Sequence, residues 1–396
     1  MGDFGAIRPG TDLSTHARAL RRVHDAVLAG GRPPMRPRAV VARSWQRVLG
    51  AGLDPGRANA RDPLPAAEWE RRRRESPLDA VIGELRQVLG SVADASRFLL
   101  VVTDADGVIL WREGAAGVRR RADDLGFSEG ALWTESAVGT NAIGTALAEG
   151  APVQLFSAEH FEQAQHAWYC TAFPVHDPRT GDLLGVVDVS GPALTLHPAL
   201  TALVETAVRL AEAQLWRHHE LRLERLRRSA ETVLATVRGP LLLVDEHGWV
   251  ASHVGVAVRE RVEVPRAGHA LAVPGLGLCT PERLGEGWLV RPRGAGRPIE
   301  ATLVRGDRPV LEVRADGEPW RAALSPRHAE LLALLAAAGP SGLSAGRLSA
   351  LLFGDAGHVV TVRAEVSRLR RVVGALVATT PYRLADGVRL EVRPAG

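Results

Sequence analysis

Three side chains that can bind a metal ion or respond to oxidants lie close together in the middle of this chain: His160, His166 and Cys170. On a helix, His166 and Cys170 would share one face, because residues four apart are neighbours there. The segment WYCTAF around Cys170, however, is rich in residues typical of strands, and no fourth zinc ligand is evident. We therefore expect neither a metal nor a cofactor, and interpret Cys170 as a buried, unreactive thiol. A haem, a bound metal or a redox-sensitive cysteine is the alternative.

A run of arginines near the C-terminus points to another chemistry, the recognition of nucleic acid. When residues 361–377 are placed on a helix at 100° per residue, Val362, Val366, Leu369 and Val373 share one face. The other face carries arginines and small residues, and such a face fits the major groove of DNA. The alternative is an ordinary basic surface helix. The expected DNA contacts, including two residues beyond the helix, are Arg363, Ser367, Arg368, Arg370, Arg371, Tyr382 and Arg383.

Aromatic and small polar residues in the middle of the chain could line a ligand pocket. Pockets in small sensor domains are mostly apolar, with a few polar groups that orient the ligand. Aromatic side chains also fill ordinary cores, and Asn141, which lies between two glycines, is typical of a helix cap, so a structural role is the alternative for each. The candidate ligand contacts are Trp111, Trp133, Thr140, Asn141, Phe156, Phe161, His166, Trp168 and Cys170, with Phe173 as a further aromatic.

Lysine is absent from the 396-residue sequence, so all 49 residues counted as Lys or Arg are arginines. A phosphate-binding loop of the GxxxxGK[ST] type needs its lysine beside the β- and γ-phosphates, and a Schiff base needs a lysine amine. Both are excluded from this chain. His24-Asp25 and His176-Asp177 are isolated pairs without catalytic spacing. We expect no enzymatic activity.

The composition is that of an ordinary globular protein, with 46% hydrophobic and 24% charged residues. The length predicts two or three domains. A formal net charge of +4 permits anionic partners without identifying one. Two cysteines provide no disulfide framework, and we find neither an apolar run long enough to span a membrane nor a signal-peptide core. We expect a cytoplasmic protein.

Changes in composition predict a multidomain α+β protein with five segments. These are a helical N-terminal segment, 1–90; a sensor domain, 91–197; a linker or dimerisation helix, 198–229; a β-rich domain, 230–320; and a C-terminal DNA-binding domain, 321–396.

Within the sensor segment, two apolar runs interrupted by turn residues predict two hairpins of one antiparallel sheet. The first covers residues 98–111, and the second has HDPRTGD (176–182) at its turn. Ser136–Glu149 is rich in Gly and Ala and is predicted to be helical. On the helix over 198–229, the stripe of Leu203, Ala207 and Leu210 fits either a linker or a parallel dimer.

Residues 321–396 are predicted to form three helices, with Gly339-Pro340 between the first two, and a closing hairpin around Asp386-Gly387. This is the layout of a winged helix. The third helix and the segment after it resemble the OmpR-type winged helix, although Pro381 stands where that family has a glycine. The resemblance implies DNA binding. The matching residues are Thr361, Val362, Val366, Leu369, Arg370, Tyr382, Arg383 and Leu384.

A second resemblance is carried by the motif ARSWQRVLGAGLDP (42–55) and by these residues: Trp133, Glu135, Gly139-Thr140-Asn141, Gly144-Thr145, Glu159-His160-Phe161, Cys170, Pro174 and Asp188-Val189-Ser190-Gly191. Over residues 15–215 the chain resembles bacterial regulators of the acetoin-operon activator type, whose sensor is a GAF domain. LLLVDEHGWV (241–250) resembles the start of a PAS domain. Those activators usually continue into an ATPase, which the absence of lysine excludes here.

The combined hypothesis is a bacterial transcription regulator that responds to a small-molecule effector and binds DNA through a winged helix. We expect a homodimer on paired half-sites that recruits or blocks RNA polymerase without ATP-driven remodelling. The alternative is a signalling adaptor whose C-terminal domain binds a protein partner such as RNA polymerase.

Overall fold

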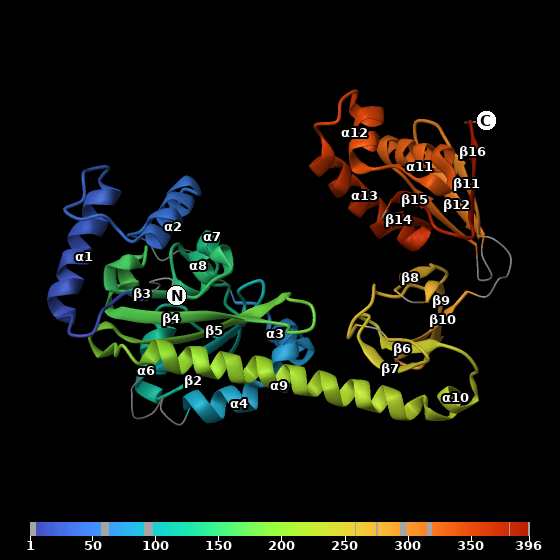
Figure 1. Ribbon diagram of the computed structural model, residues 1–396. Coiled ribbons are helices and arrows are strands. Elements are labelled where there is room, and N and C mark those ends of the chain that lie inside the picture. The colour runs from blue at the N-terminus through green and yellow to red at the C-terminus, as the bar shows by residue number, and fades with distance from the viewer. Residues whose placement is uncertain are drawn as a thin grey trace. The chain divides into compact units, whose positions relative to one another are not determined.

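The chain forms two compact units, Met1–His219 and Glu220–Gly396. The computed structural model describes residues 5–56, 63–90, 98–257, 259–274, 276–293, 299–314, 319–379 and 381–394 (Figure 1). Residues 91–97, where the first two expected segments meet, lie outside the described residues. Both units combine helices with sheets whose strands are mostly antiparallel, so the chain is a multidomain α+β protein, as expected.

A five-stranded antiparallel sheet lies at the centre of the first unit, in the order β2-β1-β5-β4-β3. The two predicted hairpins are both present, as β1–β2 and β4–β5. Asp188 lies in the middle of β5, opposite Val101 of β1 and Ala172 of β4. The strands are β1 (Leu99–Asp104), β2 (Ile109–Gly114), β3 (Val153–Phe156), β4 (Trp168–His176) and β5 (Leu183–Pro192).

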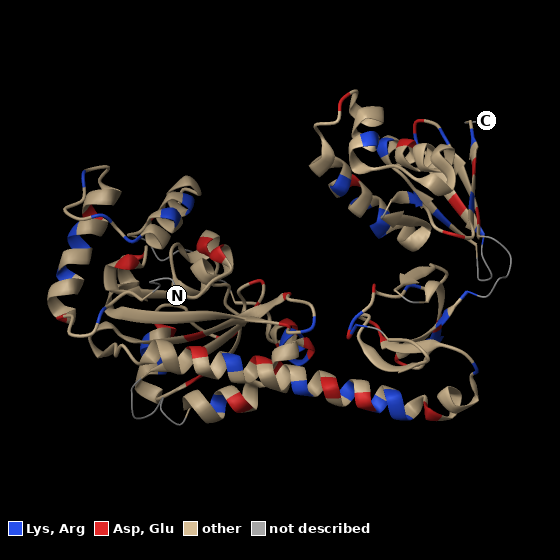
Figure 2. Ribbon diagram, in the orientation of Figure 1, with Lys and Arg blue, Asp and Glu red and all other residues tan. Residues whose placement is uncertain are grey.

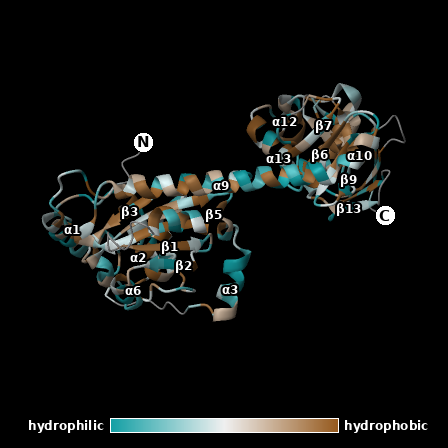
Figure 3. Ribbon diagram, turned by 90° about the horizontal axis from the view of Figure 1, so that it is seen from below, coloured by the Kyte–Doolittle hydropathy of each residue, from teal (hydrophilic) through white to brown (hydrophobic). Residues whose placement is uncertain are grey.

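Helices cover both faces of this sheet, and each face has its own hydrophobic core, so the strands are mostly hydrophobic (Figure 3). One face packs against α9 and the short turns before β1, and the other packs against α2, α6 and α8. The helices are α1 (Leu13–Leu28), α2 (Ala39–Gly50), α3 (Ala66–Glu75), α4 (Ile82–Leu85), α6 (Ala116–Asp123), α7 (Glu135–Val138), α8 (Ala142–Glu149) and α9 (Leu200–Ser229). Short helical turns are η1 (Pro77–Ala80), η2 (Arg86–Gly90), η3 (Ser157–Glu159), η4 (Gln163–Ala167) and η5 (Ala193–Thr195).

The long helix α9 packs its apolar residues against its own domain. Val204, Ala207 and Val208 are buried there, whereas Leu210 is 40% exposed. The apolar stripe of Leu203, Ala207 and Leu210 therefore does not form one exposed surface for a dimer, because Ala207 is buried in the core of its own domain. Charged residues of both signs follow along the rest of α9 (Figure 2). None of the helices in the described ranges is both long and apolar enough to cross a membrane.

The helix predicted over Ser136–Glu149 is instead two helices, α7 and α8, with a break at Gly139. Gly139 has φ +75°, and a Cβ atom at this position would lie 2.6 Å from the ring of Phe161. Asn141 then begins α8: its side-chain oxygen accepts from the Gly144 amide at 2.9 Å, which confirms the cap. A close approach of backbone to Phe161 thus interrupts an otherwise helical segment.

The second unit begins with a small sheet that has the same pattern of strand order as the first, β7-β6-β10-β9-β8. Its core is small, and Cys279 and Trp288 lie in it. The elements are α10 (Glu231–Thr236), β6 (Leu241–Asp245), β7 (Val250–Val254), β8 (Leu271–Val273), β9 (Gly277–Leu284) and β10 (Gly287–Pro292).

The C-terminal part of this unit has a four-stranded sheet, three helices and a two-stranded hairpin. The strands of the sheet are β13 (Trp320–Ala323), β12 (Val310–Arg314), β11 (Ile299–Val304) and β16 (Val388–Arg393), in that order. The helices are α11 (Pro326–Ala338), α12 (Ala345–Phe353) and α13 (Val359–Val373), and the hairpin is β14 (Val377–Thr379) with β15 (Tyr382–Leu384). Val362, Val366, Leu369 and Val373 are all buried, which confirms the predicted apolar face of α13.

The closing hairpin predicted around Asp386-Gly387 is wrong. β15 pairs with β14, whereas β16 runs parallel to β11, with Ala301 opposite Leu390. The physical reason is burial: Ile299, Ala301 and Leu303 form a face of the C-terminal core that β16 extends. One sheet therefore includes strands from both sides of the expected boundary after residue 320.

Candidate functional site

A small cavity in the first unit lies between α8 and strands β4 and β5. Its volume is about 20 Å³, enough for about one water molecule. The loop between α6 and α7 supplies apolar side chains, and the strands supply polar ones. The lining residues are Leu125, Phe127, Trp133, Asn141, Ala142, Ile143, Gln165, Trp168, Cys170, Asp188 and Ser190.

Asp188 is the unusual group in this cavity, because it is a fully buried carboxyl group. Its Oδ2 atom accepts a hydrogen bond from the Ser190 hydroxyl at 2.5 Å, whereas Oδ1 has no hydrogen-bond partner among the described residues. Burial disfavours the charged form and raises the pKa of Asp188 to about 7, against the opposing effects of Ser190 and the Thr171 backbone. A buried carboxyl group with an open oxygen is a strong candidate for contact with a ligand.

Cys170 lies beside Asp188 and is held by a histidine. The Nε2 atom of His160 is 3.2 Å from Sγ of Cys170, and Nδ1 is 2.9 Å from the Ser157 carbonyl oxygen. Because a carbonyl only accepts, Nδ1 carries the proton and the thiol donates to Nε2. Burial lowers the pKa of His160 to about 4 and raises the pKa of Cys170 well above its usual value. Cys170 is partly rather than fully buried, and its raised pKa favours the neutral thiol over the more reactive thiolate.

His166 does not line the cavity. It lies on η4, its ring meets that of His24 edge-on at 4.6 Å, and burial lowers its pKa to about 3. Because Cys170 is on a strand, His166 and Cys170 do not share a helix face. The described residues contain no group of three or more His, Cys, Asp or Glu side chains that could hold a metal ion.

Thr140 belongs to a buried polar network that attaches α2 to α7. Its hydroxyl lies 2.7 Å from that of Ser44, which donates to Glu135 at 2.5 Å. Arg47 completes the network with contacts of 2.6 and 2.8 Å to the Glu135 carboxylate. The side chain of Thr140 therefore helps to hold α2 against α7, a role that its place in the sequence did not predict.

The other aromatic candidates divide between the two sides of the sheet. Trp111, Phe156 and Phe173 belong to the core on the α9 side, away from the cavity. Phe161 lies in the core on the cavity side but packs on Gly139. The cavity brings together four of the candidates, Trp133, Asn141, Trp168 and Cys170. Asp188 was not among the expected ligand contacts, and the available signal was an acidic residue within the apolar run LLGVVDVSG.

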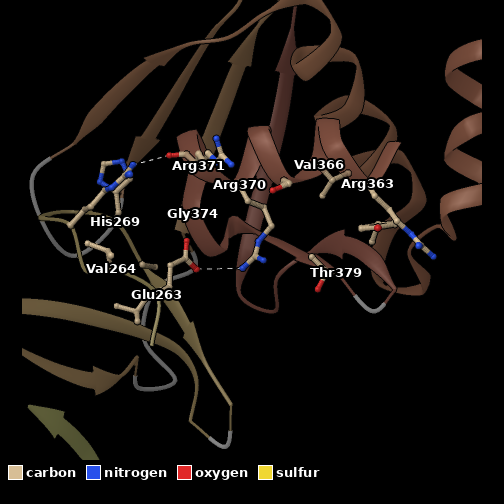
Figure 4. Close-up of a pocket in the computed structure, with 14 residues that line it drawn as sticks. Glu263, Val264, His269, Arg363, Val366, Arg370, Arg371, Gly374 and Thr379 are labelled. Carbon is tan, nitrogen blue, oxygen red and sulfur yellow. Dashed lines mark hydrogen bonds and ion pairs between the residues drawn. The ribbon is translucent and has the colours of Figure 1, made fainter. Parts of the chain in front are cut away.

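A second candidate site is a groove of about 390 Å³ in the second unit, beside α13 (Figure 4). It brings together five of the seven residues expected to contact DNA: Arg363, Ser367, Arg370, Arg371 and Tyr382. The opposite wall comes from the segment before β8 and includes Glu263, Arg266 and His269. Arg368 and Arg383 do not line the groove.

Some of these arginines form ion pairs with acidic side chains, and others do not. Arg368 pairs with Glu365, and Arg383 pairs with Asp386 at 2.6 Å. Arg370 is paired with Glu263, and the two side chains point toward each other across the groove (Figure 4). The exposed side chains of Arg363 and Arg371 have no ion pair with any described residue. Among the arginines of α13, the positive charges without an acidic partner among the described residues are therefore those of Arg363 and Arg371.

Comparison of the sequence with known proteins adds three findings. A family model described as the N-terminal domain of MimR matches residues 15–213. An uncharacterised 47.3 kDa protein from the thcA 5′ region of Rhodococcus erythropolis is 34% identical over 96% of this chain and 72% of its own length. The acetoin dehydrogenase operon transcriptional activator AcoR of Bacillus subtilis is 33% identical over 60% of this chain, but the match covers only 38% of AcoR.

The crystal structure of the DhaR(N)–DhaL complex of Escherichia coli matches with a TM-score of 0.46 at 18% identity, over 64% of this chain and 99% of the matched chain.

Proposed function

The chain belongs to the family defined by the MimR N-terminal domain, and we propose that it is a signal-responsive bacterial regulator of transcription. Residues 15–213 form its sensor, and the relation to AcoR supports this regulatory role. The five-stranded antiparallel sheet, with helices on both faces, is the arrangement that a GAF-like sensor requires. The sheet β7-β6-β10-β9-β8 is in this proposal a PAS-like domain between sensor and output.

The output of the proposed regulator is DNA binding by α13 within a winged helix. The observation that carries this proposal is the division of α13 into two faces: Val362, Val366 and Leu369 are buried, while Arg363, Ser367 and Arg371 are exposed. The hairpin β14–β15 follows α13 as a wing. Arginines on such a face contact phosphates and guanine edges in the major groove.

Regulation requires that an effector bind one state of the protein more tightly than another. The cavity around Asp188 is the proposed effector site, and a homodimer is the proposed DNA-binding form, since paired half-sites match a two-fold symmetric protein. The absence of lysine leaves no phosphate-binding loop of the lysine-containing type in this chain. The mechanism proposed is therefore recruitment or blocking of RNA polymerase, without ATP-driven remodelling.

One observation favours a second function, a signalling adaptor. Glu263 already pairs with Arg370 in the α13 groove, so this face accepts a protein carboxylate. An acidic surface of a protein such as RNA polymerase could bind there by the same chemistry.

The deciding experiment measures binding of the full chain to the promoter DNA beside its own gene and to unrelated DNA, across a salt series. We expect specific binding to exceed non-specific binding by at least about 10³. We expect Arg363→Glu with Arg371→Glu to abolish this preference, and Arg389→Glu, at an exposed position on β16, to preserve it. Equal affinity for all DNA, lost at physiological salt, would instead favour the adaptor.

A further inference from the structure

We propose that the cavity around Asp188 binds a small uncharged molecule that donates one hydrogen bond, such as a short alcohol, with Asp188 as the residue that selects it. This inference rests on the proposed sensor function and specifies the chemistry of its ligand. It starts from the open Oδ1 atom of Asp188, which has no hydrogen-bond partner among the described residues although the side chain is fully buried.

Leaving a buried acceptor without a donor costs free energy that a ligand can recover. The Ser190 hydroxyl satisfies only Oδ2. Two other polar side chains that line the cavity have hydrogen bonds elsewhere: the Asn141 amide contacts Gly139 and Gly144, and the Gln165 amide nitrogen donates to Glu162 at 2.9 Å. A ligand hydroxyl is the group that completes the site.

The apolar side chains that line the cavity determine the chemistry of the rest of the ligand. Phe127, Trp133, Ile143 and Trp168 line it, so the non-polar part of the ligand is expected to be a hydrocarbon. The present volume of about 20 Å³ is smaller than any such ligand. The ligand therefore enters by displacing lining side chains, and Leu125, Phe127 and Trp133 come from the loop between α6 and α7.

Neither of two ionic ligand classes matches the site, the first because of its charge and the second because of its number of hydrogen-bond donors. A carboxylate ligand would be repelled by ionised Asp188. An ammonium ligand carries three donors, whereas the cavity provides one open acceptor in Asp188, so two donors would be buried without partners. A ketone has no donor and cannot satisfy Oδ1 of the ionised carboxylate. An alcohol matches the single acceptor.

The test uses the full chain and four probes of similar size: 2-butanol, butanone, 2-aminobutane and isobutyrate. Dissociation constants are measured by tryptophan fluorescence at pH 8.5, because Trp133 and Trp168 line the cavity. We expect 2-butanol to bind at least about tenfold more tightly than the other three, the scale of one hydrogen bond to a charged group. Tighter binding of butanone, 2-aminobutane or isobutyrate would overturn the assignment, and so would the absence of binding by all four.

Asp188→Asn tests the role of the residue. Because the Ser190 hydroxyl donates to one side-chain oxygen, the asparagine oxygen takes that position and its amide nitrogen replaces Oδ1. The open group becomes a donor, so we expect the preference to reverse toward butanone. Asp182→Asn makes the same change on the turn of the same hairpin, where the side chain is exposed, and is expected to keep the preference for 2-butanol. An unchanged preference in a folded Asp188→Asn protein would overturn the proposal.

The unmodified chain provides a second test that does not depend on the variant folding. Asp188 has a pKa of about 7, so at pH 5.5 it is protonated and donates to a ketone instead. The titratable neighbours on β4 are Cys170 and Tyr169, whose pKa values are both raised, and His160 behind Cys170 has a pKa lowered to about 4. These groups stay neutral between pH 5.5 and 8.5, so the preference of 2-butanol over butanone is expected to fall as pH falls.

A preference that does not change with pH would contradict the role of Asp188. All of these readouts measure ligand binding without DNA. A chain that selects 2-butanol but binds no promoter would refute the DNA-binding output and leave the ligand assignment intact.

Discussion

Glu263 Oε2 lies 3.4 Å from Nη2 of Arg370, so a carboxylate of the second unit reaches an arginine of the helix proposed to contact DNA. Arg266 adds a second contact, a hydrogen bond of 2.7 Å to the carbonyl oxygen of Arg371. The segment before β8 thus neutralises part of the α13 face and holds the end of that helix. DNA that uses Arg370 must compete with Glu263.

Removal of this competitor is expected to strengthen DNA binding. Glu263→Gln frees Arg370 and removes a negative charge from the groove, so promoter affinity should rise about two- to fivefold at low salt, the scale of a partly exposed ion pair. A fluorescence anisotropy titration measures the change. Glu282→Gln breaks another pair in the same unit, with Arg291, and should leave the affinity unchanged. Weaker binding by Glu263→Gln would show that this contact supports the DNA-bound state.

The arginines of α13 are expected to contribute unequally. Arg371→Ala removes an open charge from the groove and should weaken promoter binding by about 1–3 kcal/mol. Arg368→Ala should cost less, because Glu365 already pairs with Arg368. Both dissociation constants are measured at one salt concentration, with circular dichroism to confirm folding. Equal losses would mean that Arg368 leaves Glu365 when DNA binds.

Asp188 is expected to make the first unit less stable as pH rises. Its pKa is about 7 in the folded chain and near 3.8 when unfolded, so between these values the folded state holds a proton that the unfolded state has lost. The free energy of unfolding therefore falls with pH in this window, by up to about 1.4 kcal/mol per pH unit, and levels off above pH 7.

Asp188→Asn removes this contribution, so its stability relative to the unmodified chain should increase from pH 4 to pH 7. Thermal unfolding followed by tryptophan fluorescence gives the difference at each pH. A constant difference across this window would contradict a raised pKa at Asp188.

Buried histidines are expected to have the opposite effect in acid. The pKa of His160 is lowered to about 4 and that of His166 to about 3, from 6.5 when unfolded. The unfolded state therefore binds protons that the folded state excludes, and stability is lost as pH falls below about 6.5. His166→Gln should reduce the drop in unfolding temperature between pH 7.5 and pH 5.

His253→Gln, at an exposed position of the second unit, serves as the control and should behave like the unmodified chain. If His166→Gln is as acid-sensitive as the control, His166 is not the source of the effect.

The sequence by itself determined the elements whose signals are local. The hairpin over 98–111, the long helix that ends at Ser229 and the two faces of α13 all follow from the spacing of apolar residues and from turn residues between them. The cap at Asn141 is equally local, since its side chain reaches an amide three residues away. Such features require no knowledge of which distant segments meet.

Only the tertiary structure decided which strands pair with each other and on which side of a sheet each side chain lies. β16 joins β11 rather than β15 because the C-terminal core needs another apolar strand, and that need is set by residues almost ninety positions apart. Phe156 and Phe161 pack on opposite sides of the first sheet because the turn at Ser157, with φ +50°, separates them. Asp188 becomes a candidate ligand contact only when burial removes water from its carboxyl group and leaves one oxygen without a donor. These outcomes depend on packing between distant segments, which residue spacing does not encode.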